Sequence, residues 1–178
     1  MFEIKILEDL SKSGEYSEYN FGKTNDLLWI LFLNLETGEE WIGKFDIGIR
    51  NKSKIKIFQN NTAIILARGN IYIVNCKIKK VQYIFEYDDY EDIEIDLVNN
   101  YIIITDGLYI SVHDKNGKFI KKTKRISLDG IEFIEIKNGK VYGRLNDLTF
   151  EWCDFKYNIV ENEVISKWSF IAKILRIG

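Results

Sequence analysis

A strand–turn–strand pattern recurs along the chain at intervals close to 40 residues, and this repetition constrains the fold more than any other feature. Three windows align without gaps, residues 63–76, 100–113 and 140–153, and their starts lie 37 and 40 residues apart. In each window, two strand-like runs flank a dipeptide that tolerates positive φ in a tight turn: Gly69-Asn70, Asp106-Gly107 and Asn146-Asp147. The pattern predicts three copies of one β-hairpin.

Further strand-like runs lie on both sides of each hairpin. They precede the hairpins at 54–58, 93–98 and 131–136, and they follow them at 81–87, 118–123 and 158–164. Residues 28–45 have the pattern of a strand, a Gly turn and a strand, so we expect a fourth, less regular copy near the N-terminus, with 2–7 as its first strand. Four short strands at this period are the sequence signature of propeller blades.

We therefore expect the whole chain, residues 1–178, to form a single all-β repeat domain. The predicted fold is a β-propeller-like array of three to four four-stranded antiparallel blades, with approximate repeats at 1–50, 51–90, 91–126 and 127–166 and a tail at 167–178. The complete absence of Pro and the abundance of Tyr and Phe favour this all-β prediction. A closed ring would remove exposed sheet edges, while an open set of blades and a β-sandwich of the same hairpins are the alternatives.

The turn in residues 112–120, in which Asp114 and Gly117 flank two polar residues, resembles the turn between the third and fourth strands of β-propeller repeats of the NHL and quinoprotein kinds. Residues 33–41, with Gly38, are similar. The other two repeats lack this glycine, and the Trp-Asp dipeptide of WD repeats is missing. The resemblance implies a propeller architecture and carries over no catalytic residue.

Composition excludes several classes of function. A formal net charge of −2 gives no global basic field that would hold a nucleic-acid backbone. No apolar run approaches the roughly 18 residues that span a bilayer, and the charged N-terminus does not have the pattern of a signal peptide. Two cysteines far apart in sequence do not make a disulfide framework. We expect a cytoplasmic protein without a membrane partner or cofactor, and the Pro-free composition is typical of AT-rich bacterial genomes.

Cys76, His113 and Cys153 fall at equivalent positions of the three aligned windows. Two Cys and one His are plausible zinc ligands, but equivalent positions on different blades lie too far apart to share one ion. We therefore predict no metal site, and we read the coincidence as one half-buried position of the repeat. His113 and Asp114 are neighbours on a strand and point to opposite faces, so we predict no catalytic role for His113. Asp114 is expected to cap backbone amides of the turn.

The strongest functional signal is an acidic run at residues 86–96, which holds seven carboxylates. Because Asp92, Glu94 and Asp96 alternate with apolar residues, we expect them on one solvated face of a strand. A calcium site is a weaker interpretation, since the EF-hand spacing is absent. The predicted partner surface consists of the residues Tyr87, Asp88, Asp89, Tyr90, Asp92 and Glu94. Charge reversal there is expected to weaken binding and leave the thermal transition nearly unchanged.

These observations favour a non-enzymatic protein-interaction module that binds a basic protein partner, one form of which is a bacterial immunity-type protein that covers a basic toxin. The alternative is a propeller that binds or processes a small ligand or a glycan. The basic residues at 115–125 are interpreted as protection of an outer strand against aggregation. The four Trp residues are expected in the core rather than in a sugar site.

Overall fold

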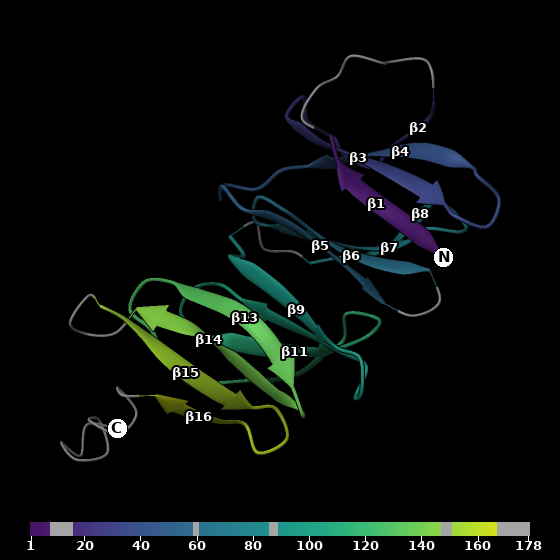
Figure 1. Cartoon of the computed structure of the whole chain (residues 1–178). Coiled ribbons are helices and arrows are strands. Elements are labelled where there is room, and N and C mark those ends of the chain that lie inside the picture. The colour runs from purple at the N-terminus through teal and green to yellow at the C-terminus, as the bar shows by residue number, and fades with distance from the viewer. Residues whose placement is uncertain (8–15, 59–60, 86–88, 147–150, 167–178) are drawn as a thin grey trace. The chain divides into compact units, whose positions relative to one another are not determined.

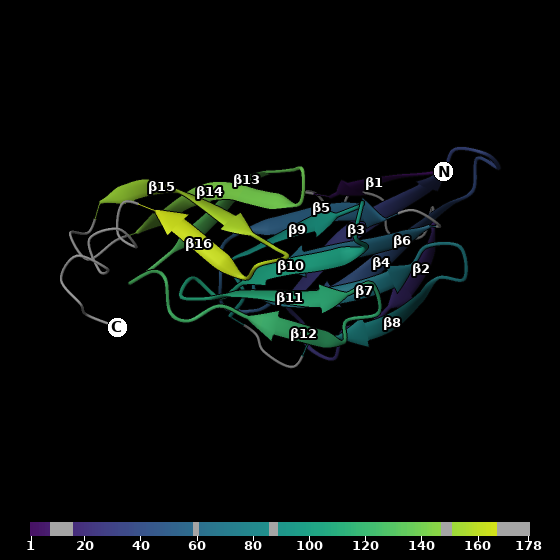
Figure 2. The same cartoon turned by 90° about the horizontal axis from the view of Figure 1, so that it is seen from below.

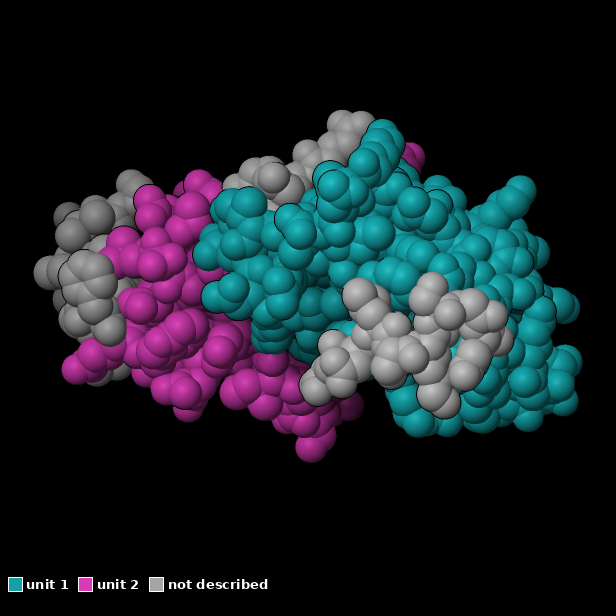
Figure 3. All heavy atoms as spheres, turned by 90° about the horizontal axis from the view of Figure 1, so that it is seen from above, with its two compact units in different colours: residues 1–89 teal, residues 90–178 magenta. Residues whose placement is uncertain are grey.

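The computed structural model describes residues 1–7, 16–58, 61–85, 89–146 and 151–166. Within these residues the chain forms sixteen β-strands and no helix, arranged as four sheets of four strands (Figure 1). The all-β prediction is confirmed. The chain divides into two compact units, Met1–Asp89 and Tyr90–Gly178 (Figure 3), and each is described by itself.

The first sheet of unit 1 has the strand order β1-β3-β4-β2. Its strands are β1 (Phe2–Ile6), β2 (Ser17–Asn20), β3 (Leu27–Asn34) and β4 (Glu40–Asp46). β3 pairs antiparallel with both β1 and β4, whereas β2 pairs parallel with β4. The sheet is therefore mixed and not the fully antiparallel blade that we expected, because β2 pairs with the outer side of β4 instead of with β3, its successor in the chain.

The second sheet of unit 1 is an antiparallel meander in the order β5-β6-β7-β8. Its strands are β5 (Ser53–Phe58), β6 (Thr62–Ala67), β7 (Asn70–Asn75) and β8 (Lys80–Ile84). The two central strands are buried on both faces, which explains why their sequences are nearly continuous apolar runs. β8 forms one edge of the sheet, and three of its five residues are exposed in succession at its end.

The core of unit 1 is built from both of its sheets and is rich in aromatic rings. Trp41 is fully buried and stacks on Phe32 with ring centroids 3.8 Å apart. Asp46 also joins the two sheets, because its carbonyl oxygen accepts hydrogen bonds from Asn70 Nδ2 (3.1 Å) and from the Tyr72 hydroxyl (3.0 Å). Burial and the nearby Asp46 carboxylate raise the pKa of Tyr72 to about 12, so this hydroxyl stays a donor at neutral pH.

Unit 2 contains two antiparallel meanders, in the orders β9-β10-β11-β12 and β13-β14-β15-β16 (Figure 2). The first has the strands β9 (Asp92–Asp96), β10 (Tyr101–Thr105), β11 (Ile110–Asp114) and β12 (Phe119–Lys122). The second has β13 (Ile131–Lys137), β14 (Lys140–Asn146), β15 (Trp152–Asn158) and β16 (Glu163–Ser166). A second apolar cluster, which includes Ile103, Val112, Val141 and Tyr157, forms the core of this unit.

The hairpin connections differ in length, and this corrects the ungapped alignment of the three windows. β6 and β7 are joined by two residues, Arg68 and Gly69, with Ala67 opposite Asn70. β10 and β11 are joined by four residues, because Thr105 lies opposite Ile110. β14 ends at Asn146 and β15 begins only at Trp152, so the two-residue turn predicted at Asn146-Asp147 is wrong.

The last repeat also contains a hairpin that we did not predict. Asn138 and Gly139 connect β13 to β14, and both have positive φ, 52° and 68°. Asn-Gly between strands is the strongest short-range hairpin signal, so the sequence does contain the information. The strand predicted at 158–164 is correspondingly displaced: Asn158 ends β15, and β16 begins at Glu163.

Candidate functional site

The acidic run was the predicted binding surface, and three of its five described carboxylates are buried. Asp92 is 0% exposed, Glu94 7% and Asp96 2%. The alternation along β9 is present, but the face that carries these three carboxylates is not solvated. The expectation that Asp92 and Glu94 form part of an exposed acidic surface is therefore wrong.

The carboxylates at the start of β9 bind backbone amides of β13, the edge strand of the next sheet. Glu91 Oε2 accepts a hydrogen bond from the Ile131 amide at 3.2 Å, and Asp92 Oδ2 accepts one from the Phe133 amide at 3.0 Å. Asp92 Oδ1 also accepts the amide of Ile93 at 2.8 Å. An edge strand presents unpaired N–H groups, and here side-chain oxygens satisfy two of them. These two carboxylates are structural.

Asp96 has a similar local function at the other end of β9. Its Oδ1 accepts the amides of Val98 (3.0 Å) and Asn99 (3.3 Å), and its Oδ2 accepts Asn99 Nδ2 at 2.6 Å. These bonds hold the turn into β10, in which Asn100 has a positive φ of 58°.

The remaining predicted site residues lie just before β9. Asp89 forms an ion pair with Arg50, and both side chains are partly exposed. Tyr90 is half-buried. Tyr87 and Asp88 lie outside the described residues.

Cys76, His113 and Cys153 do not occupy equivalent positions. His113 lies within β11 opposite Ile102, Cys153 lies near the start of β15 opposite Leu145, and Cys76 follows the last residue of β7. The unequal hairpin loops displace them, so the coincidence reflected the alignment and not the fold. Among the described residues, no group of three or more His, Cys, Asp or Glu side chains is placed to hold a metal ion.

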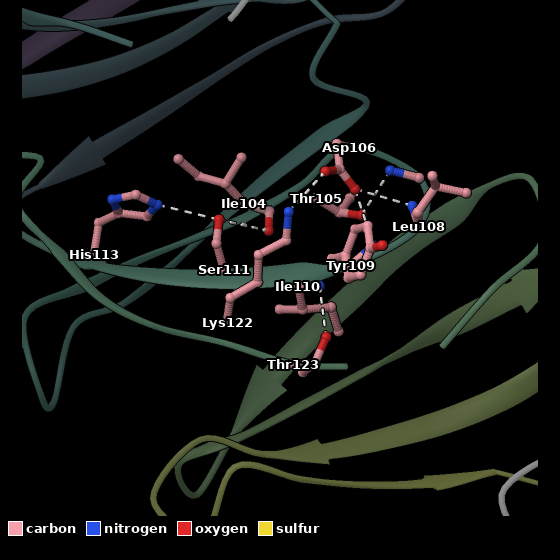
Figure 4. A network of polar contacts seen from close by, with 11 residues as sticks. Ile104, Thr105, Asp106, Leu108, Tyr109, Ile110, Ser111, His113, Lys122 and Thr123 are labelled. Atoms are coloured by element: carbon pink, nitrogen blue, oxygen red, sulfur yellow. Dashed lines mark hydrogen bonds and ion pairs between the residues drawn. The ribbon is translucent and has the colours of Figure 1, made fainter. Parts of the chain in front are cut away.

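A polar network on one face of β11 and β12 is the best-defined group of interacting polar side chains in unit 2 (Figure 4). His113 Nδ1 lies 3.2 Å from the carbonyl oxygen of Gly117, and Nε2 lies 3.1 Å from Ser111 Oγ. A carbonyl oxygen can only accept, so Nδ1 carries the proton and donates it to Gly117. Nε2 faces the Ser111 hydroxyl, which also lies 3.5 Å from the Ile104 carbonyl oxygen. Burial lowers the pKa of His113 and favours the neutral form of the ring.

This geometry joins His113 to the turn that follows β11. The same turn is held by Asp114, whose Oδ1 accepts the amides of Asn116 and Lys118, both at 2.9 Å. The prediction that Asp114 caps backbone amides is confirmed. Both ring nitrogens of His113 are engaged by groups of its own strand and turn, which supports a structural function for the imidazole.

Lys122 lies directly opposite Ser111 on the neighbouring strand, hence on the same face of the sheet. Its ammonium is 3.2 Å from Asp106 Oδ2 and 3.9 Å from the centre of the Tyr109 ring. Asp106 also fixes the four-residue loop, because its Oδ1 accepts the amides of Leu108 (3.0 Å) and Tyr109 (2.9 Å). Lys122 is thus held in place while its side chain stays 42% exposed.

The start of β12 adds exposed apolar surface to this face. Phe119 is 57% exposed and lies opposite His113, with the two rings edge to face at 5.6 Å. The register shifts by one residue between Val112 and His113, which leaves Ile120 as the extra residue of a bulge, and Ile120 is 41% exposed. Sequence reasoning found the basic residues of this segment but missed Phe119, Ser111 and their common face, since the face depends on the strand register.

A second exposed apolar group lies in unit 1, on edge strand β8. Tyr83 and Ile84 are adjacent in sequence, so they point to opposite faces of the sheet, and they are 41% and 46% exposed. The Phe85 amide donates to the Ile71 carbonyl at 3.0 Å. By the alternation of an antiparallel ladder, the Ile84 amide points away from β7.

Comparison with known proteins adds little. The chain matches no family model, and no curated protein matches it. A solved structure described as a crystal structure of the eukaryotic initiation factor is similar with a TM-score of 0.42 and 8% identity. The match covers 79% of this chain and 52% of the other, so the chain spans about half the length of that protein. Within the residues that the structure describes, no helix has the length and apolarity needed to cross a membrane.

Proposed function

We propose that the protein is a non-enzymatic protein-interaction module that binds a basic protein partner through strand β8 and the acidic segment that follows it. The observation that carries the proposal is the exposure of Tyr83 and Ile84 on the two faces of an edge strand. Exposed apolar side chains on an edge mark a place where another chain can pair.

Charge supports the basic character of the partner. In the sequence, β8 is followed after Phe85 by residues 86–90, all five of which are carboxylates or tyrosines and precede the structural Glu91 and the buried Asp92. Apolar and aromatic contacts at the centre with charged residues at the rim are typical of protein interfaces. The outward Ile84 amide offers a main-chain hydrogen bond to an added strand. Asp92 and Glu94 are no longer part of the proposed surface, because they are buried.

The binding test uses a fluorescein-labelled decapeptide of alternating Lys and Val, with a Glu-for-Lys peptide as the charge control. We expect the Lys peptide to bind the whole protein. The double variant Tyr83→Ser, Ile84→Ser is expected to bind it about thirtyfold more weakly, since each of the two exposed apolar groups contributes about 1 kcal/mol. Ile57→Ser is the matched control, because Ile57 is 42% exposed on β5, the opposite edge of the same sheet.

Equal binding of the two peptides, or equal losses in the double variant and in Ile57→Ser, would contradict the proposal. The alternative function, a site for a small ligand or a glycan, stays a prediction from the sequence.

We also propose that the four sheets form the blades of a propeller-like array. This is supported by the meander order of three of the four sheets. Small-angle scattering would test it, since a closed array is more compact than an open one.

A further inference from the structure

We propose that the face of β12 that carries Phe119 and Lys122, together with the turn at 114–118, is a binding surface for an acidic protein segment. This surface lies in unit 2 and carries a charge opposite to that of the surface proposed near β8. The inference does not depend on the function proposed above.

The cations of this surface lie close together in the sequence, and their side chains are exposed. Lys115 and Lys118 in the turn and Lys124 after β12 are exposed, and Lys122 is partly exposed and held at a fixed position by Asp106 and Tyr109. A cation that is already positioned loses less conformational freedom when it binds a carboxylate. The net charge of the whole chain is −2, so this cluster of cations is a local feature of the segment and does not reflect the overall composition.

The apolar part of the surface lies between these charges. Phe119 and Ile120 follow Lys118 directly, both are exposed, and Ile120 is the extra residue of the bulge. The Phe119 ring is supported from below by His113, whose position is fixed by Ser111 and Gly117. An exposed aromatic group flanked in the sequence by cations fits a ligand that alternates carboxylates with apolar side chains, and aromatic residues are common anchors of interfaces.

The ligand is expected to contact side chains of this face and not to extend the sheet. The main-chain edge of β12 is partly occupied within unit 2, since the Lys122 carbonyl accepts Asn162 Nδ2 at 3.4 Å. Lys121, on the other face, donates to the Val160 carbonyl at 3.1 Å. Lys121 is thus held on the opposite face of the sheet, whereas Phe119 and Lys122 are exposed on the face proposed for binding.

The experiment measures fluorescence anisotropy of the whole protein with a labelled decapeptide of alternating Glu and Ile. The Gln-for-Glu peptide and a single-stranded RNA of ten nucleotides are the comparison probes. We expect the Glu peptide to bind about tenfold more tightly than the Gln peptide at low salt and to lose this advantage at high salt, because exposed charges are screened.

Two variants test the surface. Lys115→Glu with Lys118→Glu, and separately Phe119→Ser, are each expected to weaken binding of the Glu peptide about fivefold to tenfold. Their matched controls are Lys137→Glu, an exposed cation of β13, and Ile134→Ser, which is 62% exposed on that strand. Thermal unfolding followed by circular dichroism verifies that each variant is folded.

Equal affinity for the Glu and Gln peptides, tighter binding of RNA than of the Glu peptide, or equal losses in variants and controls would each overturn the inference. The Tyr83→Ser, Ile84→Ser variant should bind the Glu peptide normally, and Phe119→Ser should bind the Lys peptide normally. Failure of one surface is therefore distinguishable from failure of the other.

Discussion

Single carboxylates in this chain stabilise backbone that the sheets leave unpaired. Asp92 binds the Phe133 amide of an edge strand, Asp96 holds the turn after β9, and Asp114 holds the turn after β11. Each of these aspartates has at least one carboxylate oxygen that accepts backbone N–H groups. A carboxylate that accepts backbone hydrogen bonds contributes more than a neutral partner would.

Replacement of Asp92 tests this conclusion at the residue scale. Asp92→Ala leaves the buried amides of Ile93 and Phe133 without their acceptor, so we expect the free energy of unfolding to fall by about 2–4 kcal/mol. Urea denaturation would measure it. Asp129→Ala, at an exposed aspartate of the same unit, is expected to change the value by less than about 0.5 kcal/mol.

An Asp92→Ala protein that unfolds at the wild-type urea concentration would contradict the structural function. This expectation replaces the one drawn from the acidic pattern, which was that charge reversal at Asp92 would leave stability unchanged.

At the scale of the elements, the loops between paired strands determine the geometry of each hairpin. The loop between β10 and β11 needs Gly107, which has a φ of 87° and lies against the side chain of Glu91. A Cβ atom at this position would lie 2.6 Å from Glu91 Cδ. The loop therefore packs against the carboxylate that binds the Ile131 amide of β13.

Gly107→Ala is expected to destabilise the protein more than Gly38→Ala. Both glycines have positive φ, 87° and 70°, so each substitution costs about 1–2 kcal/mol in the backbone. Only at Gly107 does the new methyl group also displace Glu91, while nothing lies within 4 Å of a Cβ at Gly38. We expect about 1 kcal/mol of additional loss, measured by urea denaturation. Equal losses for the two variants would show that the Glu91 contact is unimportant.

The chain contains two separate clusters of buried apolar residues. One is formed by residues of unit 1, centred on Trp41 and Phe32, and the other by residues of unit 2. Stability can then differ between regions of one chain, since each cluster supports its own sheets.

Trp41→Ala tests this division. The fully buried, stacked ring contributes about 3–5 kcal/mol, so its removal should strongly accelerate hydrogen exchange of the β3, β4, β6 and β7 amides. Amides of β10, β14 and β15 should be affected much less. Mass spectrometry of exchanged peptides would measure both regions, and equal acceleration in the two units would indicate a single cooperative core.

The sequence by itself predicted the all-β class and most of the strand positions. Alternating and continuous apolar runs, the absence of Pro and the turn residues predicted an all-β chain, and the cap at Asp114 followed from its place before Gly117. These are local features, because strand propensity and turn chemistry depend on neighbouring residues.

Only the tertiary structure decided which of these residues are accessible. An alternating carboxylate pattern at Asp92 and Glu94 indicates a common face, but burial depends on what covers that face. Here Asp92 is buried and accepts a hydrogen bond from the Phe133 amide of β13. The prediction that Cys76, His113 and Cys153 occupy equivalent positions was wrong, because the three hairpin loops differ in length and loop length sets the register between paired strands. The face that joins Ser111, His113, Phe119 and Lys122 arises from the register between β11 and β12 and its bulge, which the residue pattern along either strand does not specify.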